Sequence, residues 1–257
     1  MSLPAIAARI PGTAIARAFA GDNNNSLSTF YQEQRLTYLD AFLFARSALL
    51  KRRCYASSKF LFIHVPRCAG TYASTLIHGK PLGHLYASTI RDWILGAEQF
   101  SLKESLAVAR CPIERLVSAY CFSLQCGTNH VPQFPLYQPP RAALTSFPSF
   151  CRDWLFSQDL NRIDYIFRPQ AWWVADREQK LIVDQIIDIS ELDGWLGSKG
   201  LQRPAPSVPA QRQRHNAVER DIFDSTMATI GNDLKVDILK FYACDVRMLS
   251  RFYKSEF

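Results

Sequence analysis

Two short apolar runs, each followed at once by a turn and an amphipathic segment, constrain this chain more than any other feature. Residues 60–65 read Phe-Leu-Phe-Ile-His-Val, and residues 106–109 read Leu-Ala-Val-Ala. Nearly continuous apolar runs of this length are typical of strands buried on both faces of a parallel sheet. Residues 71–77 and 112–124 then carry apolar side chains near helical spacing. This alternation predicts an α/β fold with a P-loop-like parallel sheet flanked by helices.

The chain divides into an N-terminal extension, residues 1–58, and one domain, residues 59–257. A length of 257 residues suits a single α/β domain with such an extension. Apolar side chains recur near helical period over residues 29–53, so we expect one helix in the extension. That helix either packs on the chain's own core or meets a membrane surface or a second copy in a homodimer.

The rest of the domain shows weaker patterns. Partial alternation over residues 183–189 predicts another strand, and two helices at 217–230 and 233–253 are expected to close the chain. Prolines interrupt residues 128–148, and residues 201–212 hold Pro and Arg without a period, so we expect loops in both places.

Composition limits the partners and the compartment. The net charge of +7, from 30 basic and 23 acidic residues, suits an anionic partner, whether nucleic acid, a membrane surface or a phosphorylated cofactor. The 7 cysteines include no C-x-x-C pair, which favours reduced thiols over a disulfide framework. The 5 histidines show no ligand spacing with the cysteines, so no metal site is expected.

No membrane anchor is expected from the sequence. Residues 1–20 are interrupted by Arg9 and Arg17 and do not resemble a signal peptide, and no apolar stretch of about 18 residues occurs. A cytoplasmic bacterial protein is the simplest interpretation, and peripheral contact with a membrane stays open.

The turn after the first strand has features of a phosphate-binding loop. It reads Pro-Arg-Cys-Ala-Gly-Thr over residues 66–71, and its small residues let backbone N–H groups approach an anion at the start of a helix. Arg67 adds a planar cationic fork, and Thr71 offers a hydroxyl and a helix cap. The turn lacks the G-x-x-x-x-G-K-[ST] pattern, so magnesium ligation by a loop hydroxyl is not indicated.

The second strand leads into a similar turn. Arg110 stands where this strand ends, and ligands of open α/β sheets bind outside the carboxyl ends of strands. Pro112 fits the first turn of the following helix, where its missing N–H is not needed. Ser118 lies two helical turns beyond Cys111 and returns to the face where the helix begins. Arg110 and Ser118 are therefore candidates to hold one further phosphate.

Both motifs resemble those of the sulfotransferases that use 3′-phosphoadenosine 5′-phosphosulfate (PAPS), in particular the carbohydrate and bacterial branch. The segment Phe62–Thr71 resembles the family's 5′-phosphosulfate loop, and Ala109–Tyr120 resembles its 3′-phosphate motif. The resemblance covers residues 60–124, with weaker similarity at Arg168-Pro-Gln170 and Phe241-Tyr242-x-x-Asp245. It implies the sulfotransferase fold, PAPS as co-substrate and a carbohydrate or glycolipid acceptor. The cofactor-binding residues it implies are Arg67, Cys68, Ala69, Gly70, Thr71, Tyr72, Arg110 and Ser118.

Three further features bear on this resemblance. The family usually has Lys at the position of Arg67, which can stabilise a leaving phosphate but cannot readily donate a proton. The basic residues Arg203, Arg212 and Arg214 either close over the nucleotide or form a solvated surface loop. Cys111 replaces the polar residue more usual after the strand arginine.

His84 is the candidate catalytic base, together with Arg67 as the catalytic cation. It lies between the two phosphate motifs, where members of the family often carry a histidine, and histidine titrates near neutral pH. A structural histidine at this position is the alternative. Glu104 is the alternative base, His64 is expected to pack in its strand, and His78, His130 and His215 are weaker candidates.

The acceptor is not readable from the sequence. Aromatic side chains that either stack on sugar rings or pack in the core are Tyr137, Trp154, Trp172 and Trp173.

Two other functions remain open. A phosphotransferase of related fold would prefer a nucleoside triphosphate with magnesium, and a non-catalytic anion- or nucleic-acid-binding module would show salt-dependent affinity for polyanions.

Overall fold

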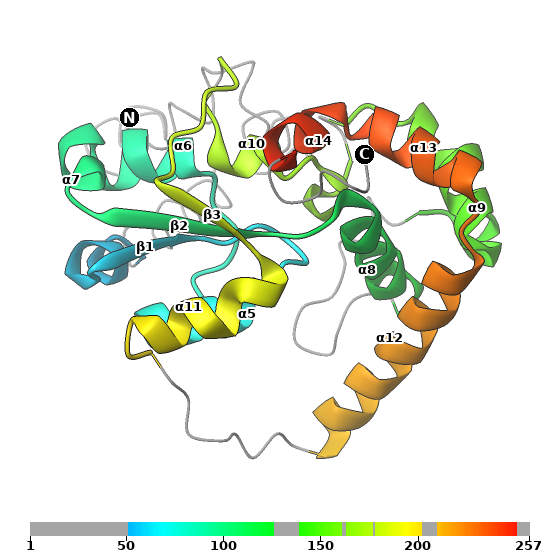
Figure 1. The fold of residues 1–257 in the computed structure, drawn as a ribbon, viewed down its shortest axis with the longest axis horizontal. Helices are drawn as coiled ribbons and strands as arrows, with labels where there is room; N and C mark the ends of the chain where they lie inside the picture. The colour runs from blue at the N-terminus through cyan, green and yellow to red at the C-terminus, as the bar shows by residue number, and fades with distance from the viewer. Residues whose placement is uncertain (1–50, 126–138, 161–162, 177, 202–209, 251–257) are drawn as a thin grey trace, which may run out of the picture. The chain divides into compact units, whose positions relative to one another are not determined.

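The computed structural model describes residues 51–125, 139–160, 163–176, 178–201 and 210–250 (Figure 1). They belong to two compact units, each built from several stretches of the chain. The sheet unit takes its described residues from Met1–Val65, Ala69–Val108 and Trp172–Ile187. The helical unit takes its described residues from Pro66–Cys68, Ala109–Ala171 and Asp188–Phe257.

The sheet unit is built on three strands in the order β1-β2-β3. Strands β1 (Phe60–Ile63) and β2 (Glu104–Ala109) pair in parallel, with Phe60 opposite Glu104, and β3 (Gln185–Asp188) lies on the other side of β2. Helix α5 lies on one face of the sheet and helices α6 and α7 on the other (Figure 1). The prediction of an α/β fold with a parallel sheet flanked by helices is therefore confirmed at this level, and the sheet is a small one of three strands.

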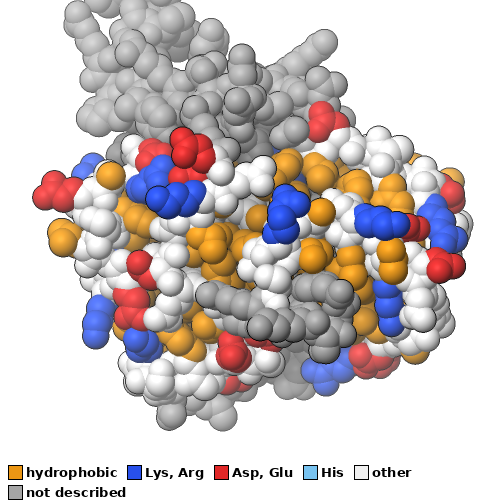
Figure 2. All heavy atoms as spheres, turned by 45° about the horizontal axis from the view of Figure 1, so that its top comes forward, with side chains coloured by type: hydrophobic (Ala, Val, Ile, Leu, Met, Phe, Trp, Pro, Cys, Tyr) orange, Lys and Arg blue, Asp and Glu red, His pale blue; other side chains and the backbone are white. Residues whose placement is uncertain are grey.

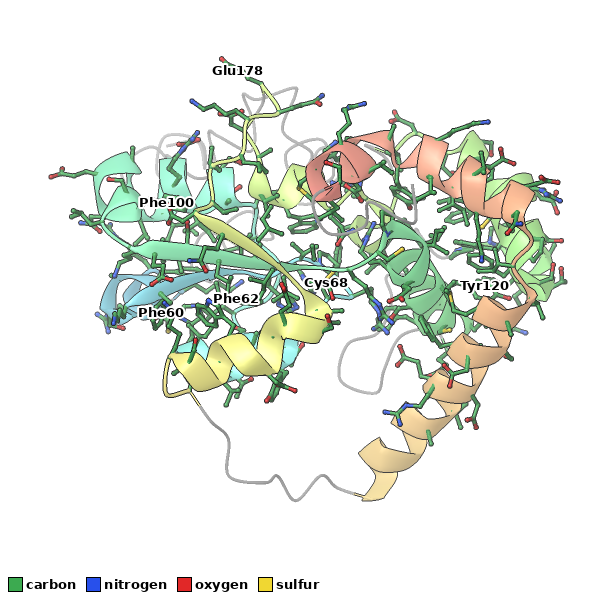
Figure 3. All side chains as sticks on the ribbon, in the orientation of Figure 1. Phe60, Phe62, Cys68, Phe100, Tyr120 and Glu178 are labelled. Atoms are coloured by element: carbon green, nitrogen blue, oxygen red, sulfur yellow. The ribbon has the colours of Figure 1, made fainter. Side chains whose placement is uncertain are left out.

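Burial explains why the two apolar runs became strands. All of β1 is buried, and so is β2 from Ser105 onward. Phe60 and Phe62 stand two residues apart in β1, so their side chains share one face of the strand, and both point to the side where α5 packs (Figure 3). At the start of β2, the carboxylate of Asp184 accepts hydrogen bonds from the backbone N–H and the hydroxyl of Ser105, at 2.8 and 2.7 Å.

The helices of this unit are short, and residues 51–57, directly before β1, are helical as well. They are α5 (Gly70–His78), α6 (Ala87–Thr89), the π-helix η1 (Ile90–Leu95), α7 (Ala97–Ser101) and α10 (Ala171–Val174), whose first residue is assigned to the helical unit.

Helix α8 (Pro112–Leu124) is the centre of the helical unit. It begins at Pro112, as the sequence predicted, and α12 (Ala210–Thr229) and α13 (Asn232–Phe241) pack against it. Tyr120 points from α8 into an aromatic cluster with Phe147 and Phe150, whose ring centroids lie 5.3 and 5.2 Å away (Figure 3). The remaining elements are η3 (Arg141–Thr145), α9 (Phe147–Ser149), η4 (Phe150–Trp154), η5 (Leu155–Ser157), η6 (Tyr165–Phe167), η7 (Ile189–Glu191), α11 (Leu192–Ser198) and α14 (Ala243–Leu249).

Two expectations about loops were wrong where the structure describes them. Residues 141–145 form η3, and α9 begins at Phe147 inside the expected loop. Pro140 precedes the first helix and Pro148 occupies the first turn of the second, where proline needs no N–H partner. Helix α12 begins at Ala210, so the expected loop at 201–212 ends in helix. Residues 126–138 and 202–209 lie outside the described part.

Two expectations about helix ends were also wrong. Thr71 does not cap α5, because the helix begins at Gly70 and its N-cap is Ala69, which has no side chain able to accept a hydrogen bond. The closing helix is interrupted at Tyr242, between α13 and α14, and its predicted last residues, 251–253, lie outside the described range. None of the helices in the described ranges has the length and apolar content that crossing a membrane requires.

Candidate functional site

The turn between β1 and α5 holds its backbone in a conformation that is costly for these residues. Arg67 and Ala69 have φ angles of 65° and 55°, in the left-handed region that residues with a Cβ rarely adopt. Each such residue costs on the order of 1–3 kcal/mol, and strain of this kind concentrates at functional sites. Helix α5 has no side-chain cap and no acidic residue in its first turn, so its N-terminal N–H groups suit an anion.

Gly70 is required by a close approach of His64. A Cβ on Gly70 would lie 1.7 Å from Cδ2 of the His64 ring, which is closer than any two such atoms can come. Burial, followed by the proximity of His84, lowers the pKa of His64 well below its usual value, so the ring is neutral. Its Nδ1 atom is buried without a hydrogen-bond partner among the described residues.

His84 lies directly against His64 in the sheet unit. The two ring centroids are 3.9 Å apart, and Nδ1 of His84 lies 3.1 Å from the backbone carbonyl oxygen of His64. Because a carbonyl only accepts hydrogen bonds, this contact places the proton of a neutral His84 on Nδ1 and the basic lone pair on Nε2. Trp173 contacts the His84 ring edge-on, at 5.9 Å between centroids.

In the helical unit, the Arg67 side chain joins the first motif to the second. Its Nε and Nη2 atoms donate to the hydroxyl of Ser118 at 3.0 and 2.9 Å. The guanidinium also forms an ion pair with Glu219 of α12 and lies 5.0 Å from the ring of Phe122. Ser118, predicted to act with Arg110, therefore has its hydrogen bonds with Arg67.

Arg110 lies within electrostatic reach of Arg67. Burial lowers the pKa of Arg67, Arg110 lowers it further, and Glu219 opposes both. The Arg110 guanidinium pairs with Glu114 at 2.9 Å and lies 4.6 Å from the centre of the Phe223 ring. Each arginine is thus paired with a carboxylate. Several other Lys and Arg side chains also stand beside acidic ones on the face in Figure 2.

The other residues of the predicted loop divide between the two units. Cys68 is fully buried in the helical unit, where its thiol donates to the side-chain oxygen of Gln170 at 3.3 Å. Thr71 and Tyr72 lie in the first turn of α5 in the sheet unit, the first exposed and the second half-buried.

Several predicted site residues are placed away from loops or outside the described part. Arg212 and Arg214 lie in the first turns of α12, so the basic stretch is helical rather than a loop from Ala210 onward. Glu104 is the first residue of β2, whereas Arg110 follows the last. Arg203, His130 and Tyr137 lie outside the described residues, and nothing is described of the side chains of Arg212, Arg214 and His215.

Two of the tryptophans considered for sugar stacking pack in the protein. Trp173 is buried and stacks on Tyr86, with ring centroids 4.2 Å apart and planes 11° apart. Trp154 packs against Phe150 and Phe167 at 5.3 and 5.5 Å. Core packing therefore accounts for both side chains, and Trp172 is half-buried in α10.

Sequence reasoning missed Glu219 and gave Gln170 and Asp245 no role beyond the weaker similarity at their segments. Glu219 carries no local signal, because a charged residue on a polar helix is ordinary. Across the ranges that the structure describes, no group of His, Cys, Asp and Glu side chains is placed to hold a metal ion. The chain matches no protein-family model, no curated protein and no solved structure.

Proposed function

We propose that this protein is a sulfotransferase that binds PAPS and transfers its sulfuryl group to a hydroxyl of a carbohydrate or glycolipid. The observation that carries the proposal is the position of the Arg67 side chain. It comes from the first motif, donates to Ser118 of the second, and lies within electrostatic reach of Arg110. The cationic residues of two motifs, some forty residues apart in the chain, thus gather in one unit.

The two motifs would hold opposite ends of the nucleotide. Arg67 of the first motif would bind the 5′-phosphosulfate through its planar cationic fork. Arg110 and Ser118 would bind the 3′-phosphate. Glu219 and Glu114 are now paired with the two arginines, and a guanidinium fork donates to phosphate oxygens in the same geometry as to carboxylate oxygens.

The chemistry needs an in-line attack and a stabilised leaving group. The acceptor oxygen would attack sulfur as the bond from sulfur to the 5′-phosphate oxygen breaks, and the electron pair would leave with adenosine 3′,5′-bisphosphate. Arg67 would stabilise the developing negative charge without giving up a proton. A base must also take the proton of the acceptor hydroxyl, and His84 is our candidate for that role.

Nucleotide selectivity tests this proposal. By calorimetry, adenosine 3′,5′-bisphosphate should bind at least about ten-fold more tightly than adenosine 5′-phosphate, since one charge-assisted phosphate contact contributes about 1.5–3 kcal/mol. Equal binding of the two, or preference for a triphosphate with magnesium, would reject the cofactor and favour a phosphotransferase. Strong binding of mixed polyanions with no 3′-phosphate preference would indicate an anion-binding module.

The Arg110→Ala variant tests the 3′-phosphate assignment. It should weaken adenosine 3′,5′-bisphosphate about ten-fold or more and leave adenosine 5′-phosphate nearly unchanged. Arg141→Ala is the matched control, because it removes the same charge from an exposed position of the helical unit. An Arg110→Ala affinity no lower than that of the control would remove Arg110 from the site.

A further inference from the structure

The side chain of Gln170 holds the peptide groups of Arg110 on both sides. Its Oε1 atom accepts from the Arg110 backbone N–H at 3.0 Å, and its Nε2 atom donates to the Arg110 carbonyl oxygen at 2.8 Å. Gln170 is completely buried, so water does not compete for these bonds. The amide therefore fixes Arg110 at the point where β2 has ended and α8 has not yet begun.

The same Oε1 atom also holds the first motif. The Cys68 thiol donates to it at 3.3 Å, and burial raises the pKa of Cys68 to about 12, so the thiol keeps its proton. Cys68 directly follows Arg67 in the chain. One amide group thus connects the residue next to Arg67 with Arg110 itself, and all of these residues belong to the helical unit.

Asp245 of α14 holds the backbone of Gln170 in place. Its two carboxylate oxygens accept from the backbone N–H groups of Gln170 and Ala171, at 2.9 and 2.8 Å. Burial raises the pKa of Asp245, while Arg115 and these N–H groups favour the carboxylate. The buried Asp245 therefore fixes the backbone position from which the Gln170 side chain extends.

From these contacts we propose that Gln170 is a positioning residue that sets the spacing of Arg67 and Arg110 for the two phosphate ends of the nucleotide. The inference rests on the proposed sulfotransferase function, because the spacing matters only when one ligand meets both arginines. A displacement of about 1 Å at such a site can cost up to about a hundred-fold in activity. Gln170 itself would touch neither nucleotide nor acceptor.

The alternative is that Gln170 only stabilises the core, and a matched control separates the two roles. Tyr242→Phe removes another buried hydrogen bond of the same unit, from the Tyr242 hydroxyl to the Phe167 carbonyl at 2.7 Å, without touching Cys68 or Arg110. Gln170→Leu removes the amide, and Gln170→Asn shortens it by one methylene and keeps it polar, should the leucine variant fail to fold.

Calorimetry with adenosine 3′,5′-bisphosphate and adenosine 5′-phosphate gives the first readout. Both Gln170 variants should lose about ten-fold or more in bisphosphate affinity and much of the preference for the bisphosphate. Tyr242→Phe should lower the melting temperature but keep the affinity and the preference. Wild-type affinity and preference in both Gln170 variants, or an equal loss in Tyr242→Phe, would overturn the proposal.

Amide hydrogen exchange gives a second readout that needs no nucleotide. Gln170→Leu or Gln170→Asn should speed exchange at the amides of Arg110, Arg67 and Cys68, and Tyr242→Phe should not. If wild-type protein binds neither nucleotide, the sulfotransferase proposal fails, whereas faster exchange at both motifs would still support the connection through Gln170. Unchanged exchange at Arg110 would overturn that connection whatever the nucleotide result.

Discussion

At the scale of single residues, the ion pair between Arg67 and Glu219 is the contact that an incoming anion would change most. The two side chains are only 20% and 22% exposed. A phosphate oxygen that reaches Arg67 must displace the Glu219 carboxylate or bind beside it. Glu219→Gln should therefore tighten the binding of adenosine 3′,5′-bisphosphate, by up to about five-fold if roughly 1 kcal/mol of competition is removed. Calorimetry measures the change.

Asp221→Asn is the control for this prediction. It makes the same change of charge on an exposed position of the same helix, so it reports only the general electrostatic effect. Its affinity should stay within about two-fold of wild type at physiological salt. Weaker binding by Glu219→Gln would mean that Glu219 holds Arg67 in its binding orientation, and competition would be the wrong account.

At the scale of elements, the sequence predicted those helix and strand features that depend on residues close together in the chain. The strands β1 and β2 follow from continuous apolar runs, and the start of α8 follows from Pro112. Their signals are local, because a parallel strand must be buried on both faces and proline needs no N–H partner in a first turn.

The elements that were missed depend on tertiary contacts or on ambiguous residues. Proline both breaks helices and starts them, so Pro140 and Pro148 did not reveal η3 and α9. The first residues of α12 are polar and show no apolar period, and the helix as a whole is positioned by its packing on α8. The Thr71 hydroxyl predicts a helix cap because hydroxyls often cap, but a left-handed Ala69 takes that position.

The start of α5 gives a prediction that belongs to this scale. Gly70→Ala should destabilise the protein by roughly 1–3 kcal/mol, because the new Cβ would overlap the His64 ring and force it to move. Urea unfolding measures the loss. In a Gly70→Ala/His64→Ala double variant the overlap is gone. The double variant should therefore lose less unfolding free energy than the sum of the losses in the two single variants.

Gly194→Ala is the matched control for this substitution. Gly194 lies in α11 with open space where a Cβ would stand, and its φ angle is not positive, so alanine should stabilise the helix by up to about 1 kcal/mol. If Gly70→Ala behaved like Gly194→Ala, the close approach of His64 would not be what requires glycine at this position.

At the scale of the whole molecule, the candidate site was predictable only as far as its two motifs. Arg67, Arg110 and Ser118 were chosen from turns that can be read locally. Their partners come from far along the chain: Glu219 is 152 residues from Arg67, and Gln170 is 60 residues from Arg110. No local pattern predicts contacts over such separations, because they exist only once the helical unit has folded.

Burial of neutral histidines makes the stability of the fold depend on pH. Burial lowers the pKa of His64 well below 6.5 and that of His78, aided by Lys103, to about 4. In the unfolded chain both titrate near 6.5, so below that pH the unfolded state binds more protons than the folded state. The free energy of unfolding should therefore be highest above pH 6.5 and fall as the pH drops toward about 4.

Urea unfolding at a series of pH values measures this dependence, and His78→Gln separates the contributions. Glutamine does not titrate, so the slope of the unfolding free energy between about pH 6 and about pH 4.5 should fall by nearly one proton. Asp245 acts with the opposite sign, since burial raises its pKa above 3.8, and this partly offsets the loss at the acidic end. A wild-type stability that stays flat down to about pH 5 would show that neither histidine is held neutral by burial.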